Sequence, residues 1–587
     1  MKTTQPPRLG RTLLAATIAT AAFASLPLQA IEYDVGETNI KFDATFSAGA
    51  SWRVSERANY NIRSASETPV SYGNSGSGND SNLNYDKGDI FSKVVKVTPE
   101  LEITHGDYGA FFRAKAFYDF KMMDGELRYY KEGINQHGLN DVGSSIDLLD
   151  AFVYGNFDLG GHPLTVRVGQ QALGWGEAIF ASGGIASINP VDGNAARLPG
   201  AEVKEIILPT GMISLSFGFT DTVSAEGFYR PSTFWKETVL PSCGSYFLPR
   251  DITGSGGPNL NAANSCTHLR IAGPAVTTNA NGDIIGSDLY STAASAGYIP
   301  RDPDIHPEKD EYGVALRFVL PTDYEVGLFY TMTNATTGTI YGRPASAPPP
   351  AGIPTGSYGF YFPEGIESYG ISFNGNSWGN AFQGELVYRP NNPLNYAEAA
   401  MIQSNLLGST PLVNKKLITG LLPNGVPTLD MTEEAETWQA STAVTRVLNP
   451  TALWDSGSLL VEVVGNYAAL NNDAVVITSP QVLRHYDANE FAWGYRARLG
   501  LNYFNISPLG LTLGPSILWS HDVNGVNRSG VGTGMKEGNQ VLTLGFETKY
   551  LTKHTVTVSY SNFIHSKAYT DNLSDRDFVS LNYIYSL

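Results

Sequence analysis

A histidine held by a carboxylate near a nucleophile is the usual signature of a hydrolase, because the acid orients the imidazole that acts as general base. The chain has 9 histidines, and the pairs considered for this role are those in His485-Tyr486-Asp487 and in His521-Asp522. Single pairs of this kind are weak signals. The sequence contains neither a G-x-S-x-G turn nor a cluster with metal-ligand spacing. We therefore expect no enzyme, no metal and no cofactor.

Acids and bases able to face each other across water form a second set of residues. The segment 169–209, GQQALGWGEAIFASGGIASINPVDGNAARLPGAEVKEIILP, is more apolar than the other long connections. An exterior connection should be hydrophilic, so this one is expected to fold inward. It carries Glu177, Asp192, Arg197, Glu202 and Glu205, and the strands predicted below carry Arg113, Lys115, Arg167, Arg496 and Arg498. Together they predict either a charged channel constriction with a transverse field or salt bridges that brace the segment.

The strands that must position these side chains show strict alternation of apolar and polar residues. In 40–54, IKFDATFSAGASWRV, every even position is apolar and every odd position is polar, charged or glycine. The same period recurs in 110–121, 324–332, 459–467 and 491–503. The first run is far longer than the strand of about 5–6 residues that is usual in globular proteins.

The connections between the predicted strands are of two kinds. Some are short, such as 105–109 and 321–323, and others are long and rich in Gly, Ser, Asn and Pro, including 55–90, 172–210, 230–310, 334–366 and 390–433. Short turns on one side and long loops on the other are typical of a transmembrane β-barrel.

We therefore predict an all-β fold, a single transmembrane antiparallel β-barrel spanning 31–587, with about 18 strands and about 16 as the alternative. The predicted strands are 40–54, 91–104, 110–121, 146–157, 163–171, 211–219, 222–230, 311–320, 324–333, 367–374, 381–389, 434–448, 457–469, 490–504, 511–521, 538–551, 554–563 and 577–587.

The polar faces of these strands carry too much charge for a dry core, because a buried charge needs a partner or water. Lys41, Asp43, Glu547 and Lys549 join the bases named above on these faces. We expect a wet lumen, with the apolar faces against outer-membrane lipid and lipopolysaccharide. The alternative is a large secreted array of β-sandwiches.

The first 30 residues are predicted to be a Sec signal peptide. Lys2, Arg8 and Arg11 precede an apolar run, and LQA supplies a small-residue cleavage site at Ala30. An uncleaved anchor is the alternative. The last strand, DFVSLNYIYSL, alternates aromatic residues in a way that resembles the signal read by the outer-membrane assembly machinery. The expected location is the outer membrane of a Gram-negative bacterium.

Charge and cysteine content limit the partners and the redox state. The formal net charge of −17 at pH 7 argues against a nucleic-acid partner, which would need basic patches. Cys243 and Cys266 are the two cysteines, and in an exported protein such a pair is a disulfide candidate. Two free thiols are the alternative.

Four short motifs lie in and after the acid-bearing segment. They are Trp175-Gly176-Glu177, Asn189-Pro190-Val191-Asp192, Arg197-x-Pro199-Gly200-Ala201-Glu202 and Cys243-Gly244-x-Tyr246-Phe247. With these motifs the chain resembles a family of Gram-negative outer-membrane proteins catalogued as domain of unknown function thirteen-oh-two. The resemblance implies a porin-like barrel. It also implies, as partners, a periplasmic lipoprotein-carrier-like protein and an RND-type transporter, and hence traffic of lipids or other hydrophobic molecules.

The expected function is an outer-membrane channel that passes hydrophobic or amphipathic small molecules by facilitated diffusion. A general or ion-selective porin for polar solutes is one alternative. A structural barrel that serves as the outer partner of an envelope lipid-transport complex is another. An apolar patch in the lumen would favour the first of these three, and a hydrophilic lumen of mixed charge would favour the second.

Overall fold

The computed structural model describes residues 31–58, 82, 84–125, 127, 136–241, 244–248, 302–343, 357–395, 432–469, 489–527, 534–551, 553–564 and 573–587. It also describes short strands between 269 and 299 and between 417 and 429. The predicted signal peptide, the cysteines Cys243 and Cys266, the His485-Tyr486-Asp487 triplet and most of the 390–433 loop lie outside these residues.

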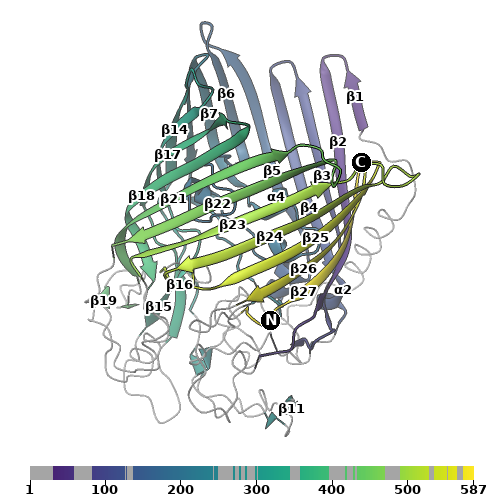
Figure 1. Cartoon of the computed structure of the whole chain (residues 1–587). Coiled ribbons are helices and arrows are strands. Elements are labelled where there is room, and N and C mark those ends of the chain that lie inside the picture. Colours follow the sequence, from purple (N-terminus) through teal and green to yellow (C-terminus); the bar gives the residue numbers. More distant parts are fainter. Residues whose placement is uncertain are drawn as a thin grey trace.

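Eighteen antiparallel strands close into one barrel (Figure 1), as the sequence predicts. They are β2 (Thr38–Arg53), β3 (Ile90–His105), β4 (Tyr108–Asp119), β5 (Ser144–Asp158), β6 (Pro163–Gln171), β7 (Thr210–Thr220), β8 (Val223–Arg230), β13 (Glu311–Val319), β14 (Glu325–Thr333), β17 (Ile366–Ser377), β18 (Asn380–Asn395), β21 (Thr432–Leu448), β22 (Ser456–Ala468), β23 (Phe491–Asn502), β24 (Thr512–Asn524), β25 (Gln540–Tyr550), β26 (His554–Ile564) and β27 (Phe578–Ser586). The barrel closes where β2 pairs with β27, from Thr45 opposite Ser586 to Arg53 opposite Phe578. A further strand, β1 (Ile31–Val35), pairs with the first residues of β2.

The two ends of the barrel differ. Short turns lie at the top in Figure 1, and strands that belong to the long connections, such as β15 (Thr339–Arg343), β16 (Ser357–Tyr361) and β19 (Leu417–Ile418), lie at the bottom. We call these the turn side and the loop side. The other short strands are β9 (Leu269–Arg270), β10 (Thr277–Thr278), β11 (Ile284–Gly286), β12 (Tyr298–Ile299) and β20 (Thr428–Leu429).

Helices contribute little to the described part of the chain. They are α2 (Phe120–Met123), α3 (Gln136–Val142), α4 (Val203–Ile206) and the 3-10 turns η3 (Ile185–Ile188), η4 (Ala195–Arg197) and η5 (Ser232–Phe234). No helix among the described residues is long and apolar enough to cross a membrane.

Alternation gives the wall an apolar outer face. Outward side chains such as Val314, Leu316 and Val463 are exposed, which suits contact with lipid. Neighbouring strands also carry an outward row of aromatic residues: Tyr229, Tyr312, Tyr330, Tyr369, Tyr388, Trp438, Tyr467 and Phe491. Within this row the Tyr388 and Trp438 rings are 4.4 Å apart. Aromatic girdles of this kind mark the membrane–water interfaces of transmembrane barrels.

The third long connection, residues 172–209, folds into the barrel, as predicted. We call it the third loop. Trp175, Ile185 and Ile188 of this loop form a buried cluster with inward side chains of the wall, including Phe228 of β8 and Phe329 of β14. The hydrophobic core therefore lies between the third loop and one side of the inner wall.

Candidate functional site

The third loop forms two lobes that contact different parts of the wall. The first lobe, residues 172–190, reaches β14, β17, β18, β21 and β22. The second lobe, residues 191–208, reaches β2, β3, β4 and β27. This arrangement narrows the lumen along most of its circumference.

Two buried wall carboxylates hold the first lobe by its backbone. Glu462 of β22 accepts hydrogen bonds from the amides of Ile179, Phe180 and Ala181 at 2.7, 2.8 and 2.9 Å. Glu385 of β18 accepts from the amides of Glu177 at 2.7 Å, Ala178 at 3.4 Å and Ile185 at 3.0 Å. Amide donors satisfy buried acceptors that water cannot reach, so these carboxylates fix the path of the lobe.

Glycines make room for the Glu385 carboxylate. A Cβ on Gly184 would lie 1.7 Å from Glu385 Oε1, and one on Gly176 would lie 2.8 Å from Glu385 Oε2. Gly176 also has φ of +93°, which disfavours a side chain. The glycine of the Trp175-Gly176-Glu177 motif thus allows close approach of the loop backbone to the wall.

Two wall arginines hold carbonyl groups of the same lobe. The guanidinium of Arg230 is buried, forms an ion pair with Glu311 and donates to the carbonyl of Ile188 at 3.1 and 3.2 Å. Arg389 donates to the carbonyl of Gly184 at 2.9 Å. The wall therefore supplies both donors and acceptors to the loop backbone.

Side-chain ion pairs hold the second lobe. Glu205 pairs with Lys96 of β3 and accepts from the Thr98 hydroxyl at 2.6 Å, and all three side chains are buried. Lys96 also donates to the carbonyl of Gly200 at 2.8 Å. Asp192 accepts from Lys115 of β4 at 3.1 Å. These contacts are a brace in which acid and base neutralise each other.

Lys204 and Glu202 extend this brace. Lys204 Nζ lies 2.8 Å from Glu100 of β3 and 3.4 Å from Glu202. Burial lowers the pKa of Lys204, but the hydrogen bond to Glu100 and the charges of Glu202 and Glu100 outweigh it and raise the pKa overall. Glu205 also accepts from the amide of Glu202 at 3.2 Å, which ties the start of α4 to its first turn.

Asn189 and Trp175 shape the first lobe from within. The Asn189 side chain accepts from the amide of Leu173 at 3.0 Å and donates to its carbonyl at 2.7 Å. Trp175 Nε1 donates to Glu226 of β8 at 2.6 Å. In the second lobe, Asp192 accepts from the amides of Asn194 and Ala195 at 2.9 Å. The carbonyl of Pro190, at the end of the first lobe, accepts from the amide of Leu208. These motif residues thus stabilise the folded path of the third loop, a role that the sequence alone does not reveal.

Glu177 differs from the other loop acids. Its side chain is half-buried and accepts from Asn374 of β17 at 2.9 Å, with no ion pair in the described part of the chain. Burial is the main cause of a raised pKa of Glu177, and Glu325 and Glu385 add to it, while the Asn374 hydrogen bond and Arg317 oppose it. Of the four predicted acids, Glu177 is thus the one that forms no ion pair with another described residue.

The wall bases predicted to face the loop divide into two groups. Lys115 contacts it, whereas Arg113 pairs on the wall with Glu100 at 3.2 Å and Asp150 at 2.8 Å. Arg496 pairs with Asp522 at 2.9 Å. Arg167 and Arg498 are exposed, and no hydrogen bond or ion pair joins either to the described residues.

The pair His521-Asp522 separates in the fold. Asp522 faces the lumen and Arg496, while the His521 ring packs on Tyr495 of the outer face, with ring centroids 5.6 Å apart. Adjacent residues of a strand point to opposite faces, so these two side chains cannot act together.

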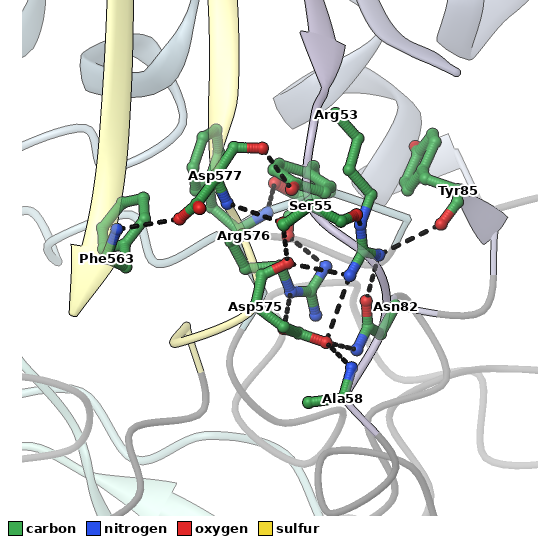
Figure 2. Close-up of polar contacts among 12 residues, drawn as sticks. Arg53, Ser55, Ala58, Asn82, Tyr85, Phe563, Asp575, Arg576 and Asp577 are labelled. Atoms are coloured by element: carbon green, nitrogen blue, oxygen red, sulfur yellow. Dashed lines mark hydrogen bonds and ion pairs between the residues drawn. The ribbon is translucent and has the colours of Figure 1, made fainter. Parts of the chain in front are cut away.

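A buried cluster closes the loop side of the β2–β27 seam, and we call it the rim cluster. Figure 2 shows Arg53, Asn82, Tyr85, Asp575 and Arg576 in this cluster, with Arg53 3.1 Å from Asp575. The backbone carbonyl of Tyr246 accepts from Arg576 at 2.5 Å, and the Tyr246 ring stacks 4.1 Å from Phe91.

The rim cluster also links two loops to the barrel seam. Arg197 of the third loop lies over the Phe247 ring at 4.9 Å, and Phe247 packs against Phe578 of β27 at 5.3 Å. The Arg197 motif and the Tyr246-Phe247 motif therefore meet in space. Arg197 therefore contacts the rim cluster, unlike the other residues that the sequence predicts for a constriction.

The wall opposite the loop is bare. In the described part of the chain, no hydrogen bond or ion pair joins the third loop to β24, β25 or β26. The inward positions there are mainly polar, such as Thr543, Glu547, Ser559 and Ser561. The loop, in contrast, leaves Ile179, Phe180 and Val203 exposed at 39%, 36% and 70%. The bare wall is therefore polar, whereas the loop inside the barrel carries exposed apolar side chains.

Sequence reasoning missed the residues that hold the loop: Lys96, Arg230, Glu385, Arg389 and Glu462. Glu462 had a detectable signal, because it is a single acid at an inward position of the otherwise apolar strand SLLVEVV. A lone charge at such a position needs a partner.

The chain matches the family described as "Protein of unknown function (DUF1302)" over residues 11–587. No curated protein matches the sequence. Among solved structures, the chain is similar to OccAB1 of Acinetobacter baumannii, with 10% identity, 94% of this chain and 97% of that chain covered, and a TM-score of 0.42. It is also similar to OccD3 (OpdP) of Pseudomonas aeruginosa, with 9% identity, coverage of 96% and 95%, and a TM-score of 0.37. Since the family match extends over nearly the whole chain, the chain belongs to the DUF1302 family.

Proposed function

We propose that this protein is a channel of the Gram-negative outer membrane through which hydrophobic or amphipathic small molecules diffuse, with the third loop as its constriction. The observation that carries the proposal is the third loop itself. It is anchored inside the barrel by buried charges, yet it exposes Ile179, Phe180 and Val203. Apolar side chains held in a wet lumen lower the cost of moving an apolar solute past a constriction.

The half-buried carboxylate of Glu177 gives the constriction a charge filter, while Asp192, Glu202 and Glu205 serve as a brace. In this proposal the solute passes between the third loop and the bare wall of β24, β25 and β26, so the passage has one polar and one apolar side. That geometry suits a molecule with both kinds of surface.

A second candidate is a porin for polar solutes. The polar inward positions of β24, β25 and β26 favour it, because water can run along them without contact with the loop. The two candidates share the channel and differ in what the exposed apolar side chains do.

Single-channel conductance of the purified protein in a planar bilayer tests the channel. We expect steady conductance that rises several-fold when residues 177–188 are replaced by a Gly-Ser linker. A well-folded barrel that conducts nothing in either form would overturn the proposal.

Block of the current by matched neutral solutes tests the preference for amphipathic molecules. Hexyl glucoside should stay in the pore about tenfold longer than glucose, since burying part of its chain is worth about 1–2 kcal/mol. The variant Ile179→Ser/Phe180→Ser should remove this difference. Leu453→Ser, an exposed apolar residue of a short turn, is the matched control. Equal residence of the two solutes in the unmodified protein would favour the polar porin.

A further inference from the structure

We propose that the lumenal face of β4, β5 and β6, between the third loop and the turn side, binds an amphipathic carboxylate, with its head group at Arg167 and its apolar body on Phe111 and Phe152. This inference rests on the proposed function, since it names the solute class of the same channel. It concerns a patch that the third loop does not touch.

The patch combines aromatic rings and guanidinium groups on neighbouring strands. Phe111 lies opposite Phe152, and Tyr154 lies opposite Arg167, in the strand register. The Phe111 and Phe152 ring centroids are 5.6 Å apart, and those of Phe152 and Tyr154 are 6.4 Å apart. We call these residues, with Arg113, the β4–β6 patch.

The register places the patch inside the barrel. Arg113 shares its face with Glu100, which binds Lys204 of the third loop, so this face is turned to the lumen. Phe111 lies two positions before Arg113 on the same strand, so its side chain points to the same face. Phe111 and Phe152 are each partly exposed. Apolar rings in a wet lumen are an unfavourable surface unless a solute or the fold covers them.

The two arginines of the patch differ in their partners. The Arg113 guanidinium lies 5.0 Å from the Phe111 centroid and is neutralised by Glu100 and Asp150. The Arg167 guanidinium lies 5.6 Å from the Phe152 centroid and is exposed. No carboxylate among the described residues pairs with it. Stacking leaves the edge of a guanidinium free, and that edge matches the two oxygens of a carboxylate.

The chemistry of the ligand follows from this pairing. A carboxylate can accept two parallel hydrogen bonds from Arg167, while an alkyl or aryl chain covers the adjacent rings. Tyr154 donates to Glu102 at 3.4 Å, so an acid already occupies the far side of Tyr154. This acid disfavours an anionic head group there and leaves Arg167 as the anchor.

Equilibrium dialysis of 4-phenylbutanoate against the full-length protein in nanodiscs, with empty nanodiscs as the blank, tests the proposal. Arg167→Gln should weaken binding about tenfold, the loss expected for a charge-assisted pair. Arg498→Gln is the matched control, because Arg498 is also an exposed lumenal arginine without an ion pair but has no aromatic stack in the described residues. Arg167→Lys should give an intermediate affinity, since it keeps the charge and loses the planar fork.

Two comparison solutes separate the contribution of the aromatic rings to binding from the contribution of the Arg167 charge. Butanoate lacks the ring, and 4-phenylbutanol lacks the charge, so both should bind more weakly than 4-phenylbutanoate. Equal weakening by Arg167→Gln and Arg498→Gln, or unchanged binding in both, would overturn the assignment of the patch. Binding does not require passage, so a protein that binds at Arg167 but conducts nothing would overturn the proposed channel and leave the site in place.

Discussion

The two lobes of the third loop are held by opposite means. The wall carboxylates of Glu385 and Glu462 accept hydrogen bonds from backbone amides of the first lobe. In the second lobe, carboxylate side chains form ion pairs with Lys96 and Lys115 of the wall. Backbone contacts fix a path whatever side chains the loop carries. Side-chain contacts, in contrast, depend on particular residues at both ends. The first lobe can therefore vary in its exposed residues, such as Ile179 and Phe180, without losing its anchor.

The largest expected effect comes from breaking the buried ion pair of the second lobe. Glu205→Leu should destabilise docking of this lobe by about 3–5 kcal/mol, because Lys96 stays buried without its counter-charge. The double variant Lys96→Met/Glu205→Leu should recover most of the loss, since an apolar pair can replace a buried ion pair. Hydrogen exchange of residues 192–206 measures docking. A double variant as weakly protected as the single one would contradict this account.

Glu462→Gln should loosen the first lobe by about 2–3 kcal/mol, because an amide group replaces one of the two acceptor oxygens. Here no second substitution can restore the contact, since the partners are backbone amides. Hydrogen exchange at residues 179–181 gives the measurement. Glu547→Gln is the control, because Glu547 is a lumenal acid of the bare wall that pairs with Lys549. Similar exchange in both variants would mean that Glu462 does not anchor the lobe.

The rim cluster contains both a side-chain ion pair, between Arg53 and Asp575, and hydrogen bonds to backbone groups. The pH dependence of its stability tests the contribution of the ion pair. Burial raises the pKa of Asp575, but Arg576, Arg53, Asn82 and the amide of Ala58 outweigh it and hold the pKa below the usual range. A carboxyl with a lowered folded pKa stabilises the fold above its unfolded pKa of about 3.9, and the contribution disappears as pH falls through the folded pKa.

Asp575→Asn should therefore cost about 2 kcal/mol at neutral pH and remove the acid sensitivity that Asp575 contributes. The measurement is proteolysis of residues 573–577 between neutral pH and pH 3. If the unmodified cluster opens well above the ordinary carboxyl range, the predicted direction is wrong.

The smallest expected effect belongs to Glu177→Gln. The raised pKa of Glu177 means that the fold favours its protonated form, a contribution present below the unfolded pKa and lost as pH rises through the folded one. The neutral variant should change stability by no more than about 0.5 kcal/mol. The reversal potential in a salt gradient should shift only modestly toward anions. A complete loss of selectivity would instead identify Glu177 as the dominant charge of the constriction.

The barrel was predictable because strand alternation survives in nearly every wall segment. All the predicted strands are present, with differences mainly at their ends: β18 continues from 389 to Asn395 through an irregular register between Arg389 and Asn392. The strand β1 was not predicted, since Ile31–Val35 was assigned to the segment before the first strand. The strands β15 and β16 were missed because Gly and Pro interrupt the alternation of their loop.

The site was predictable only in part. Inward folding of the third loop followed from its apolar composition, and the contact of Asp192 with Lys115 joins two residues that the sequence had singled out. The hydrogen bonds from loop amides to Glu385 and Glu462 could not be predicted from the sequence. Every residue except proline has a backbone amide, and a sequence does not show which amides are unpaired. The rim cluster likewise joins residues more than five hundred positions apart, as in Arg53 and Asp575.

The third loop touches both strands of the closing seam. A Cβ on Gly49 of β2 would lie 2.5 Å from Pro199, and one on Gly200 would lie 2.4 Å from the Asn582 side chain of β27. Docking of the loop and closure of the barrel are therefore coupled, because the loop packs against both of the strands that meet at the seam. Changes at Pro199 or Gly200 should thus reduce the yield of closed barrels before they alter what passes through one.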